Sequence, residues 1–405
     1  MKIAVVFDSY STGGGGFFIS LNSALLLNKM KSEKLDFHFI SIFEDTHKIL
    51  EENNLKILKF SYNKVRLSRL HFRLSGFPII NLIFEKFKIK NYFFKFLKKN
   101  NFSLVIFLSP SFLINLCDEI DFIVNIFDIN HKLDNFFPEY KSQNLFKDKE
   151  LIFKKSVDRA FKILFDTCRS KKELTEYYNC RPSKIVIQPT IPILPKKYKD
   201  IKEKINIELI YEKLGLKKND KFIFYPAHFW AHKNHKYIID AIEILKFKKK
   251  IDLKVVFSGS AKENLDYIKN QVNKKKLSDN FYFFEFLTGE KVITLYKKTI
   301  ALVMPTYVAR STLPLYEAFF FKVPVFYSKN VLDKELEEYV EVFDLNNAQN
   351  LADKLDNFIN NKLIFEDKIQ KATEYFDTNC NDEKCINNFK NILSEFEYLK
   401  SRWNE

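Results

Sequence analysis

Short apolar runs alternate with longer amphipathic stretches along almost the whole chain. The runs in the first half lie at 2–7, 37–43, 103–108, 122–127, 162–165 and 184–187. Runs of this length, rich in β-branched and aromatic residues, are typical of strands buried on both faces of a parallel sheet. The stretches between them, such as 17–30, repeat apolar residues at helical spacing. This alternation predicts an α/β fold with a doubly wound sheet.

A segment with three prolines, residues 188–204, interrupts the alternation, and strand-like runs then resume at 221–227, 253–260, 280–286, 300–305 and 323–328. We therefore expect two Rossmann-like domains that face a cleft, with ligands at the carboxyl ends of the strands. The expected bounds are 1–190 for the first domain, 191–204 for a linker, 205–385 for the second domain, and 386–405 for a C-terminal helix that packs back on the first domain.

The formal net charge of +15 favours anionic partners, although Lys, Asn, Phe and Ile are all abundant and a general compositional bias would have the same effect. Nucleic acid is not expected, because we find neither a concentrated basic stripe nor a known reading module. The five irregularly spaced cysteines fit free thiols in a reducing cytoplasm. No apolar run approaches the length that spans a bilayer. A cytoplasmic protein is therefore expected.

Four of the eight glycines are consecutive, Gly13 to Gly16, between the first expected strand and the first expected helix. Gly15 and Gly16 there would let a ligand approach the backbone at a helix N-terminus, where anions are favoured; the alternative is a flexible turn. The run is not a dinucleotide-binding fingerprint, since Phe18 and Ile19 stand where such a pattern needs glycine.

The stretch HFWAHKNH, residues 228–235, holds three histidines and at first suggests zinc. It follows a strand-like run, so residues 228–232 are expected to form a loop, with Asn234 as N-cap and a helix that starts at His235. No carboxylate or cysteine completes a ligand set nearby, and we predict no metal site.

The stretch 304–326 predicts a strand, a loop and a helix that opens near Leu313. The backbone N–H groups of Ser311, Thr312 and Leu313 could then face a phosphate or a sugar. Glu317 lies one turn into an otherwise apolar helix and needs hydrogen-bond donors. Either two ribose hydroxyls or the backbone of a neighbouring loop could supply them.

The segment LPLYEAFFFKVPVF resembles the LPLxEAMAxGxPV signature of GT-B glycosyltransferases, in particular glycosyltransferase family four (group 1), of the type that builds bacterial surface polysaccharides. The resemblance implies that Glu317 holds the nucleotide ribose and that the amides of Ser311, Thr312 and Leu313 meet the donor. Two positions depart from the family pattern. Ala309 replaces an earlier glutamate, and Lys322 replaces a glycine.

Three further segments extend this resemblance. FIFYPAHFWAHKNH is similar to a YPAQFWPHKNH form of the family, which implies that Lys233 neutralises the donor diphosphate while His228 stands where relatives often have arginine. FSGSAKENLDYI implies that Gly259 permits close packing by the nucleotide. NIFDINHKLDNFFPEY implies that His131 lies near the reacting sugar with Asp128 as its orienting neighbour, although a structural histidine remains the alternative.

The resemblance implies a retaining, metal-independent transfer, with no cofactor, from a nucleoside diphosphate sugar to a glycan or lipid-linked glycan acceptor in capsule, O-antigen or lipooligosaccharide synthesis. The alternatives are an inactive nucleotide-sugar-binding protein and a nucleotide-sugar epimerase of the same fold. Residues 63–87 mix basic and apolar side chains. They predict either contact with an anionic membrane, peripheral on the inner face of the cytoplasmic membrane, or a solvated helix face.

Overall fold

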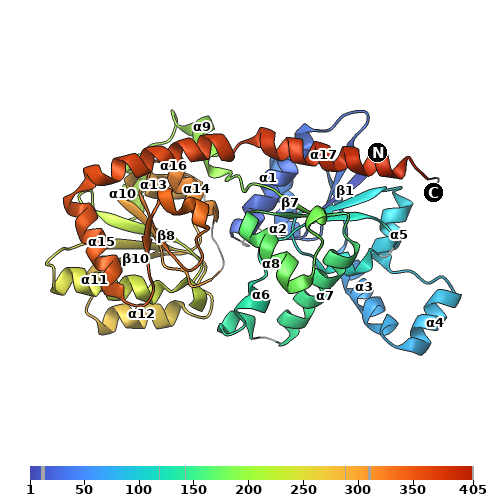
Figure 1. Cartoon of the computed structure of the whole chain (residues 1–405), viewed down its shortest axis with the longest axis horizontal. Helices are drawn as coiled ribbons and strands as arrows, with labels where there is room; N and C mark the ends of the chain where they lie inside the picture. The colour runs from blue at the N-terminus through green and yellow to red at the C-terminus, as the bar shows by residue number, and fades with distance from the viewer. Residues whose placement is uncertain (11–13, 118, 142, 288, 309–311, 404–405) are drawn as a thin grey trace. The chain divides into compact units, whose positions relative to one another are not determined.

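The computed structural model describes residues 1–10, 14–117, 119–141, 143–287, 289–308 and 312–403, which form two compact units (Figure 1). Unit 1 comprises residues 1–132, 142–189 and 382–405, and unit 2 comprises residues 133–141 and 190–381. Each unit is a parallel sheet flanked by helices, so the predicted α/β class with two doubly wound sheets is confirmed.

Unit 1 contains a seven-stranded sheet in the order β3-β2-β1-β4-β5-β6-β7, and every pairing is parallel. The central strands are apolar and buried along almost their whole length, as expected for a sheet covered on both faces. The strands are β1 (Lys2–Phe7), β2 (Asp36–Ser41), β3 (Ile57–Lys59), β4 (Leu104–Phe107), β5 (Phe122–Asn125), β6 (Lys162–Phe165) and β7 (Ile185–Ile187).

Helices cover both faces of this sheet (Figure 1). They are α1 (Gly15–Lys29), α2 (Glu44–Glu52), α3 (Tyr62–Ser75), α4 (Pro78–Lys86), α5 (Tyr92–Lys99), α6 (Asn130–Leu133), α7 (Gln143–Arg159), α8 (Cys168–Tyr178) and α17 (Asp382–Lys400), with short 3₁₀ turns η1 (Phe112–Leu116) and η3 (Pro182–Lys184). No helix in the described ranges is long and apolar enough to cross a membrane.

Unit 2 contains a six-stranded parallel sheet in the order β10-β9-β8-β11-β12-β13. Its strands are β8 (Phe222–Pro226), β9 (Lys254–Ser258), β10 (Phe281–Phe284), β11 (Ala301–Met304), β12 (Val325–Ser328) and β13 (Glu341–Phe343). Its helices are α9 (Leu194–Ile201), α10 (Ile207–Lys213), α11 (His235–Phe247), α12 (Leu265–Lys274), α13 (Glu290–Lys298), α14 (Thr312–Phe320), α15 (Ala348–Asn360) and α16 (Glu366–Asn379). The 3₁₀ turns are η2 (Pro138–Tyr140), η4 (Ala231–Lys233), η5 (Ser278–Asn280), η6 (Lys334–Tyr339) and η7 (Lys362–Phe365).

Two parts of the expected domain plan differ from the structure. The segment 191–204, expected as a linker, contains helix α9, whose Leu194 and Pro195 are buried and whose Tyr198 ring packs 5.3 Å from that of Phe321. Proline is tolerated in a first helical turn because its missing N–H has no partner there anyway. Residues 133–141, expected in the first domain, belong to unit 2.

The strand order of each sheet fixes where a ligand is expected. Strand order reverses between β1 and β4 in unit 1, and between β8 and β11 in unit 2. Ligands of doubly wound sheets bind outside the carboxyl ends of the strands at such switch points. The loops and helices that directly follow β1, β8 and β11 carry most of the residues singled out in the sequence.

Candidate functional site

The loop after β8 is a turn that presents Lys233. The turn η4 ends at Lys233, whose carbonyl accepts a hydrogen bond from the Tyr225 hydroxyl at 3.0 Å. Helix α11 begins at His235, as predicted. Asn234 occupies the cap position in a left-handed conformation with φ of 54°, but its side chain makes no capping hydrogen bond. The sequence therefore predicts the start of the helix correctly but not the role of the Asn234 side chain.

The three histidines of this loop have separate environments. His235 is fully buried against the rings of Phe229 and Phe257, and burial lowers its pKa to about 3. His232 is held by Glu139, and His228 accepts a hydrogen bond at Nδ1 from the Ser260 N–H at 3.0 Å. Among the described residues no group of three or more His, Cys, Asp or Glu side chains could hold a metal ion.

His228 is a neutral side chain between two cations. Burial, together with the charges of Lys262 and Lys233, lowers its pKa to about 4. It therefore does not replace the arginine of relatives as a positive charge at neutral pH. Lys262, whose ammonium lies 5.1 Å from the centre of the Trp230 ring, supplies a second positive charge that was not identified in the sequence.

Gly259 follows β9 at a point where no side chain fits. A Cβ atom there would lie 2.2 Å from the carbonyl oxygen of Ala227 and 2.8 Å from the Cα of His228. The protein's own backbone thus requires glycine at position 259. This close contact packs the turn after β9 against the loop that leads to Lys233.

Helix α14 places Glu317 in the interior of unit 2. The helix begins at Thr312, and Thr312 and Leu313 are both buried in its first turn. The Tyr296 hydroxyl donates to Glu317 Oε2 at 2.9 Å. Burial raises the pKa of Glu317 to about 8, against the smaller opposing effect of this hydrogen bond. Ser311 and Ala309, also singled out in the sequence, lie outside the described residues.

In unit 1, the described part of the glycine run opens helix α1 at the switch point. Gly14 has φ of 69°, a left-handed conformation that favours glycine, and α1 starts at Gly15. A Cβ atom on Gly16 would lie 3.2 Å from the ring of Phe127. Gly15 is exposed at this helix N-terminus, where it could meet an anion.

His131 lies in α6, in a buried hydrogen-bonded cluster. Its Nε2 lies 3.2 Å from Glu150 Oε1 and 3.1 Å from the Tyr178 hydroxyl, which also donates to Glu150. Burial lowers the pKa of His131 to about 4, so the ring is neutral at pH 7. Its Nδ1 has no hydrogen-bond partner among the described residues.

Asp128, the expected neighbour of His131, lies near enough to raise the pKa of that ring, and its Oδ1 accepts a hydrogen bond from the Asn130 N–H at 3.0 Å, at the start of α6. Glu150 and Tyr178 hold the imidazole. They come from α7 and α8, and no local spacing in the sequence identifies them.

A polar cluster at the ends of β1 and β4 was also missed. Ser111 donates to the Asp8 carboxylate, and Arg69 lies near enough to lower the pKa of Asp8, although burial raises that pKa overall. The Arg69 guanidinium stacks 4.7 Å from the Phe112 ring centre. The cluster adjoins the loop after β1 in unit 1.

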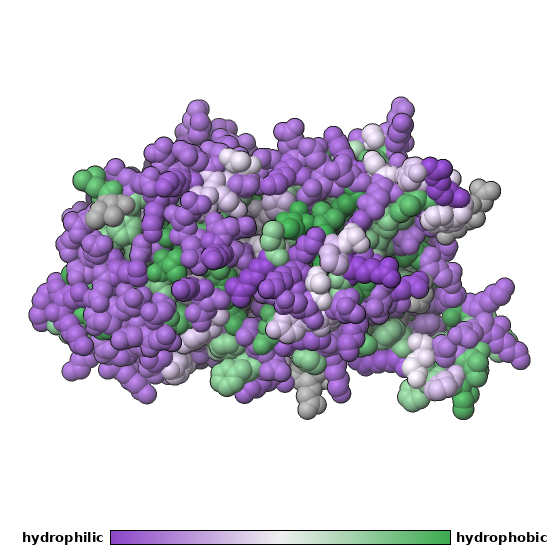
Figure 2. Space-filling view, in the orientation of Figure 1, coloured by the Kyte–Doolittle hydropathy of each residue, from purple (hydrophilic) through white to green (hydrophobic). Residues whose placement is uncertain are grey.

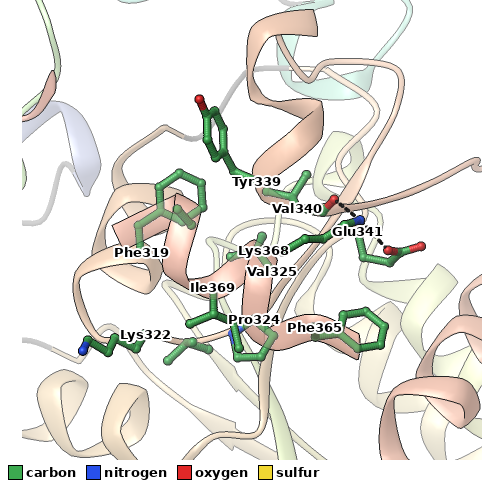
Figure 3. Close-up of a pocket in the computed structure, with 12 residues that line it drawn as sticks. Phe319, Lys322, Pro324, Val325, Tyr339, Val340, Glu341, Phe365, Lys368 and Ile369 are labelled. Carbon is green, nitrogen blue, oxygen red and sulfur yellow. Dashed lines mark hydrogen bonds and ion pairs between the residues drawn. The ribbon is translucent and has the colours of Figure 1, made fainter. Parts of the chain in front are cut away.

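A pocket of unit 2 lies at the amino ends of β12 and β13 (Figure 3). It is lined mostly by apolar side chains, and Glu341 at its rim accepts from Lys368 at 2.8 Å and also from Lys354. It contains no residue that the sequence singled out as a ligand-binding candidate.

Comparisons with known proteins agree with this architecture. Residues 206–375 match the family model described as glycosyl transferases group 1. No curated protein matches the chain in sequence. Similar solved structures include a glycosyltransferase from Rickettsia africae, at 16% identity and a TM-score of 0.69, with 97% of this chain and 98% of that chain covered.

Two other solved structures are similar to this chain. Anabaena Alr3699/HepE in complex with UDP-glucose is 14% identical with a TM-score of 0.73, over 98% of this chain and 100% of that chain. WaaG, a glycosyltransferase involved in lipopolysaccharide biosynthesis, is 14% identical with a TM-score of 0.67, over 95% of this chain and 98% of that chain. At these identities the likeness shows the fold.

The chain therefore has the GT-B fold, and its residues 206–375 form a glycosyl transferases group 1 domain. This domain and this fold together identify the chain as a glycosyltransferase.

Proposed function

We propose that this glycosyltransferase moves a sugar from a nucleoside diphosphate sugar to a glycan or lipid-linked glycan acceptor, with retention of the anomeric configuration and without a metal or cofactor. We place the reaction in surface polysaccharide synthesis in the cytoplasm. The resemblance of WaaG and of the UDP-glucose complex of Alr3699/HepE supports the donor class and the pathway.

The buried carboxylate of Glu317 is the observation that carries the donor assignment. It lies on α14, the helix that follows β11, and the Tyr296 hydroxyl donates to its Oε2 at 2.9 Å. A buried carboxylate needs donors to stay ionised. The two vicinal hydroxyls of a ribose are such donors. Nucleotide binding would then lower the raised pKa of Glu317.

The diphosphate would be neutralised by lysines and helix N-termini. Lys233 follows β8, Lys262 follows β9, and α14 begins after β11. The three groups therefore follow the carboxyl ends of neighbouring parallel strands. Fixed charges and N–H dipoles in a partly buried site stabilise a departing phosphate without reorganisation. We assign Lys262 the role that arginine has in relatives.

In unit 1 we propose a role in sugar transfer for His131 and for the N-terminus of α1, which contains Gly15 and Gly16. Glu150 and Tyr178 fix the His131 ring through Nε2, and the buried Nδ1 has no hydrogen-bond partner among the described residues. We propose a front-face reaction in which the leaving phosphate accepts the proton of the acceptor hydroxyl. Recovery of a product with inverted anomeric configuration would rule this mechanism out.

A donor screen with two matched variants tests the proposal. Thermal shift against a panel of nucleotide sugars identifies the donor, and mass spectrometry of products separates transfer from epimerisation and from binding alone. Glu317→Ala is expected to weaken nucleotide binding at least tenfold, the loss of one or more charge-assisted hydrogen bonds. His131→Ala should keep that affinity and lose transfer. Unchanged affinity in Glu317→Ala would refute the ribose role, and full activity in His131→Ala would clear His131.

We further propose that helix α4 attaches the enzyme to an anionic membrane surface. No side chain of α4 is buried, and Phe77, Ile79, Leu82 and Phe87 are 60%, 75%, 64% and 66% exposed. Figure 2 shows apolar atoms gathered over α4 at the lower right, bordered by hydrophilic ones. Helix α3 supports α4, since the His71 ring stacks 4.3 Å from that of Phe84.

The charge around these apolar side chains favours anionic lipid over a neutral partner. Glu85 is the one acidic residue between positions 62 and 90, against the basic residues Lys64, Arg66, Arg69, Arg73, Lys86, Lys88 and Lys90. Arg69 is occupied by Phe112 and Asp8, and Lys90 pairs with Glu119 at 2.6 Å, so the remaining basic residues are the candidates for lipid contact. Each is worth about 1 kcal/mol near an anionic leaflet.

Flotation with vesicles of phosphatidylglycerol and phosphatidylcholine tests the membrane surface. The wild-type chain is expected to float with the anionic vesicles and not with phosphatidylcholine alone, and salt should weaken the association. Replacing Ile79 and Leu82 by Glu should abolish flotation. Leu363→Glu, a change at an equally exposed leucine of unit 2, should not. A wild-type chain that stays with neither vesicle at low salt would contradict the proposal.

A further inference from the structure

The short turn η2 belongs to a segment of unit 2, residues 133–141, although the chain before and after that segment belongs to unit 1. The turn contains Glu139, to which the family resemblance assigns no role. Residue His131 lies just before this segment in the chain.

Glu139 holds the loop after β8 through a single residue, His232. Its Oε1 accepts a hydrogen bond from the His232 backbone N–H at 3.0 Å and also contacts His232 Nδ1. Both side chains are only 6% exposed. Burial raises the pKa of Glu139, but the hydrogen bonds from His232 outweigh it and hold the pKa below its ordinary value. The ring of Tyr140 stacks on His232 at 5.6 Å.

The carbonyl group of His232 holds the other donor loop. It accepts hydrogen bonds from the Tyr307 N–H at 2.9 Å and from the Thr306 hydroxyl at 3.3 Å. Thr306 and Tyr307 follow β11 and lead toward α14, whereas Lys233 follows His232 directly. The His232 carbonyl thus connects the loop that contains Lys233 to the loop that precedes α14. Glu139 fixes the same residue through its backbone N–H.

We propose that Glu139 is a positioning residue for sugar transfer, which holds Lys233 and the N-terminus of α14 at the spacing that a diphosphate requires. The inference rests on the proposed function. A misplacement of about 1 Å in a binding loop is enough to weaken catalysis strongly. A buried carboxylate with two hydrogen bonds from one residue constrains that residue more tightly than loop packing alone.

Hydrogen exchange on the full chain without ligand tests the positioning directly. Glu139→Ala is expected to raise the exchange rates of the His232 and Tyr307 amides about tenfold or more. The His232 N–H loses its acceptor, Glu139 Oε1, and the Tyr307 N–H donates to a His232 carbonyl that is no longer held in place. Glu139→Gln keeps an acceptor oxygen and should have a smaller effect. If Glu139→Ala does not fold, Glu139→Gln is compared with the wild type at the same two amides.

Glu341→Gln is the matched control, since Glu341 also accepts from two basic groups, Lys354 and Lys368, but at the amino end of β13 (Figure 3). It should leave the amides of His232 and Tyr307 unchanged. Wild-type protection of these amides in both Glu139 variants would overturn the inference.

Pyrophosphate affinity, measured by calorimetry, gives a second readout that a merely structural role would not move. Glu139→Ala should weaken pyrophosphate binding about tenfold, and Glu139→Gln should restore most of the loss. Equal affinity in Glu139→Ala and the wild type would also overturn the positioning role. A wild type that binds pyrophosphate but transfers no sugar would count against the proposed function alone.

Discussion

At the scale of single residues, the raised pKa of Glu317 makes the free energy of unfolding depend on pH. The folded chain keeps the proton of this carboxyl up to about pH 8, whereas the unfolded chain releases it above about pH 4.5. Unfolding therefore releases a proton between these values, and Glu317 lowers the stability increasingly as pH rises through this window. The buried carboxylate therefore lowers the free energy of unfolding of the protein without its proposed ligand.

Glu317→Gln should remove this cost, because the amide has nearly the same shape and no charge. We expect the stability advantage of the variant over the wild type to grow between about pH 5 and pH 8, to about 5 kcal/mol, since each unit of the raised pKa corresponds to about 1.4 kcal/mol. Thermal unfolding at several pH values measures the difference. Glu208→Gln, at an exposed ion pair with Lys298, should show no such trend. A stability difference that is constant with pH would contradict the assignment of the raised pKa.

At the scale of elements, the end of α14 explains one departure from the family signature. Lys322 has φ of 57°, the left-handed conformation for which relatives have glycine. The Val323 N–H donates to the Ala318 carbonyl at 2.9 Å and the Lys322 N–H to that of Phe319 at 3.2 Å, which is the hydrogen-bond pattern of a Schellman motif. The turn therefore survives the replacement of glycine by lysine, at a conformational cost.

Lys322→Gly should stabilise unit 2 by about 1 kcal/mol, since glycine adopts this conformation without the steric penalty of a Cβ atom. Denaturant unfolding measures the change. Lys371→Gly, the same replacement inside helix α16, should instead destabilise by about 1 kcal/mol. A loss of stability in both variants would show that the Lys322 side chain contributes more than its backbone costs.

The elements that the sequence predicts best are the long apolar ones. Strands β1 and β6 have the predicted bounds, and α11 begins at the predicted residue. Strands β3 and β13 were not predicted, because each has three residues and too few apolar positions to show a pattern. Of the candidate site, the residues after β8, β9 and β11 are those that sequence motifs predict.

The partners of those site residues could not be predicted. Glu150 and Tyr178 meet His131, and Glu139 meets His232 across 93 positions of sequence. Pairing at that separation depends on how the strands are ordered in the sheet, which local spacing does not encode. The lysines and asparagines with positive φ could not be predicted either, because these residue types, unlike glycine, do not indicate a left-handed turn in the sequence.

At the scale of the whole molecule, helix α17 belongs to unit 1, the same unit as residues 1–132. Helix α17 buries Cys385, Phe389, Ile392, Leu393 and Phe396 in unit 1. The Asn388 amide donates to the Ile187 carbonyl at 2.9 Å, and Lys162 and Glu395 form an ion pair at 2.8 Å. Unit 1 is therefore assembled from sequence on both sides of unit 2.

Deletion of residues 382–405 should consequently unfold unit 1 and leave unit 2 folded. Burial of an apolar side chain of this size contributes about 1.5–3 kcal/mol, so the loss of five exceeds or approaches the stability of an ordinary domain. Hydrogen exchange of peptides from β1 and β4, compared with peptides from β8 and β11, measures each unit separately. Phe389→Ala should lower the stability of unit 1 by about 3–5 kcal/mol without complete unfolding. Native protection of β1 and β4 in the truncated chain would show that residues 1–189 fold without α17.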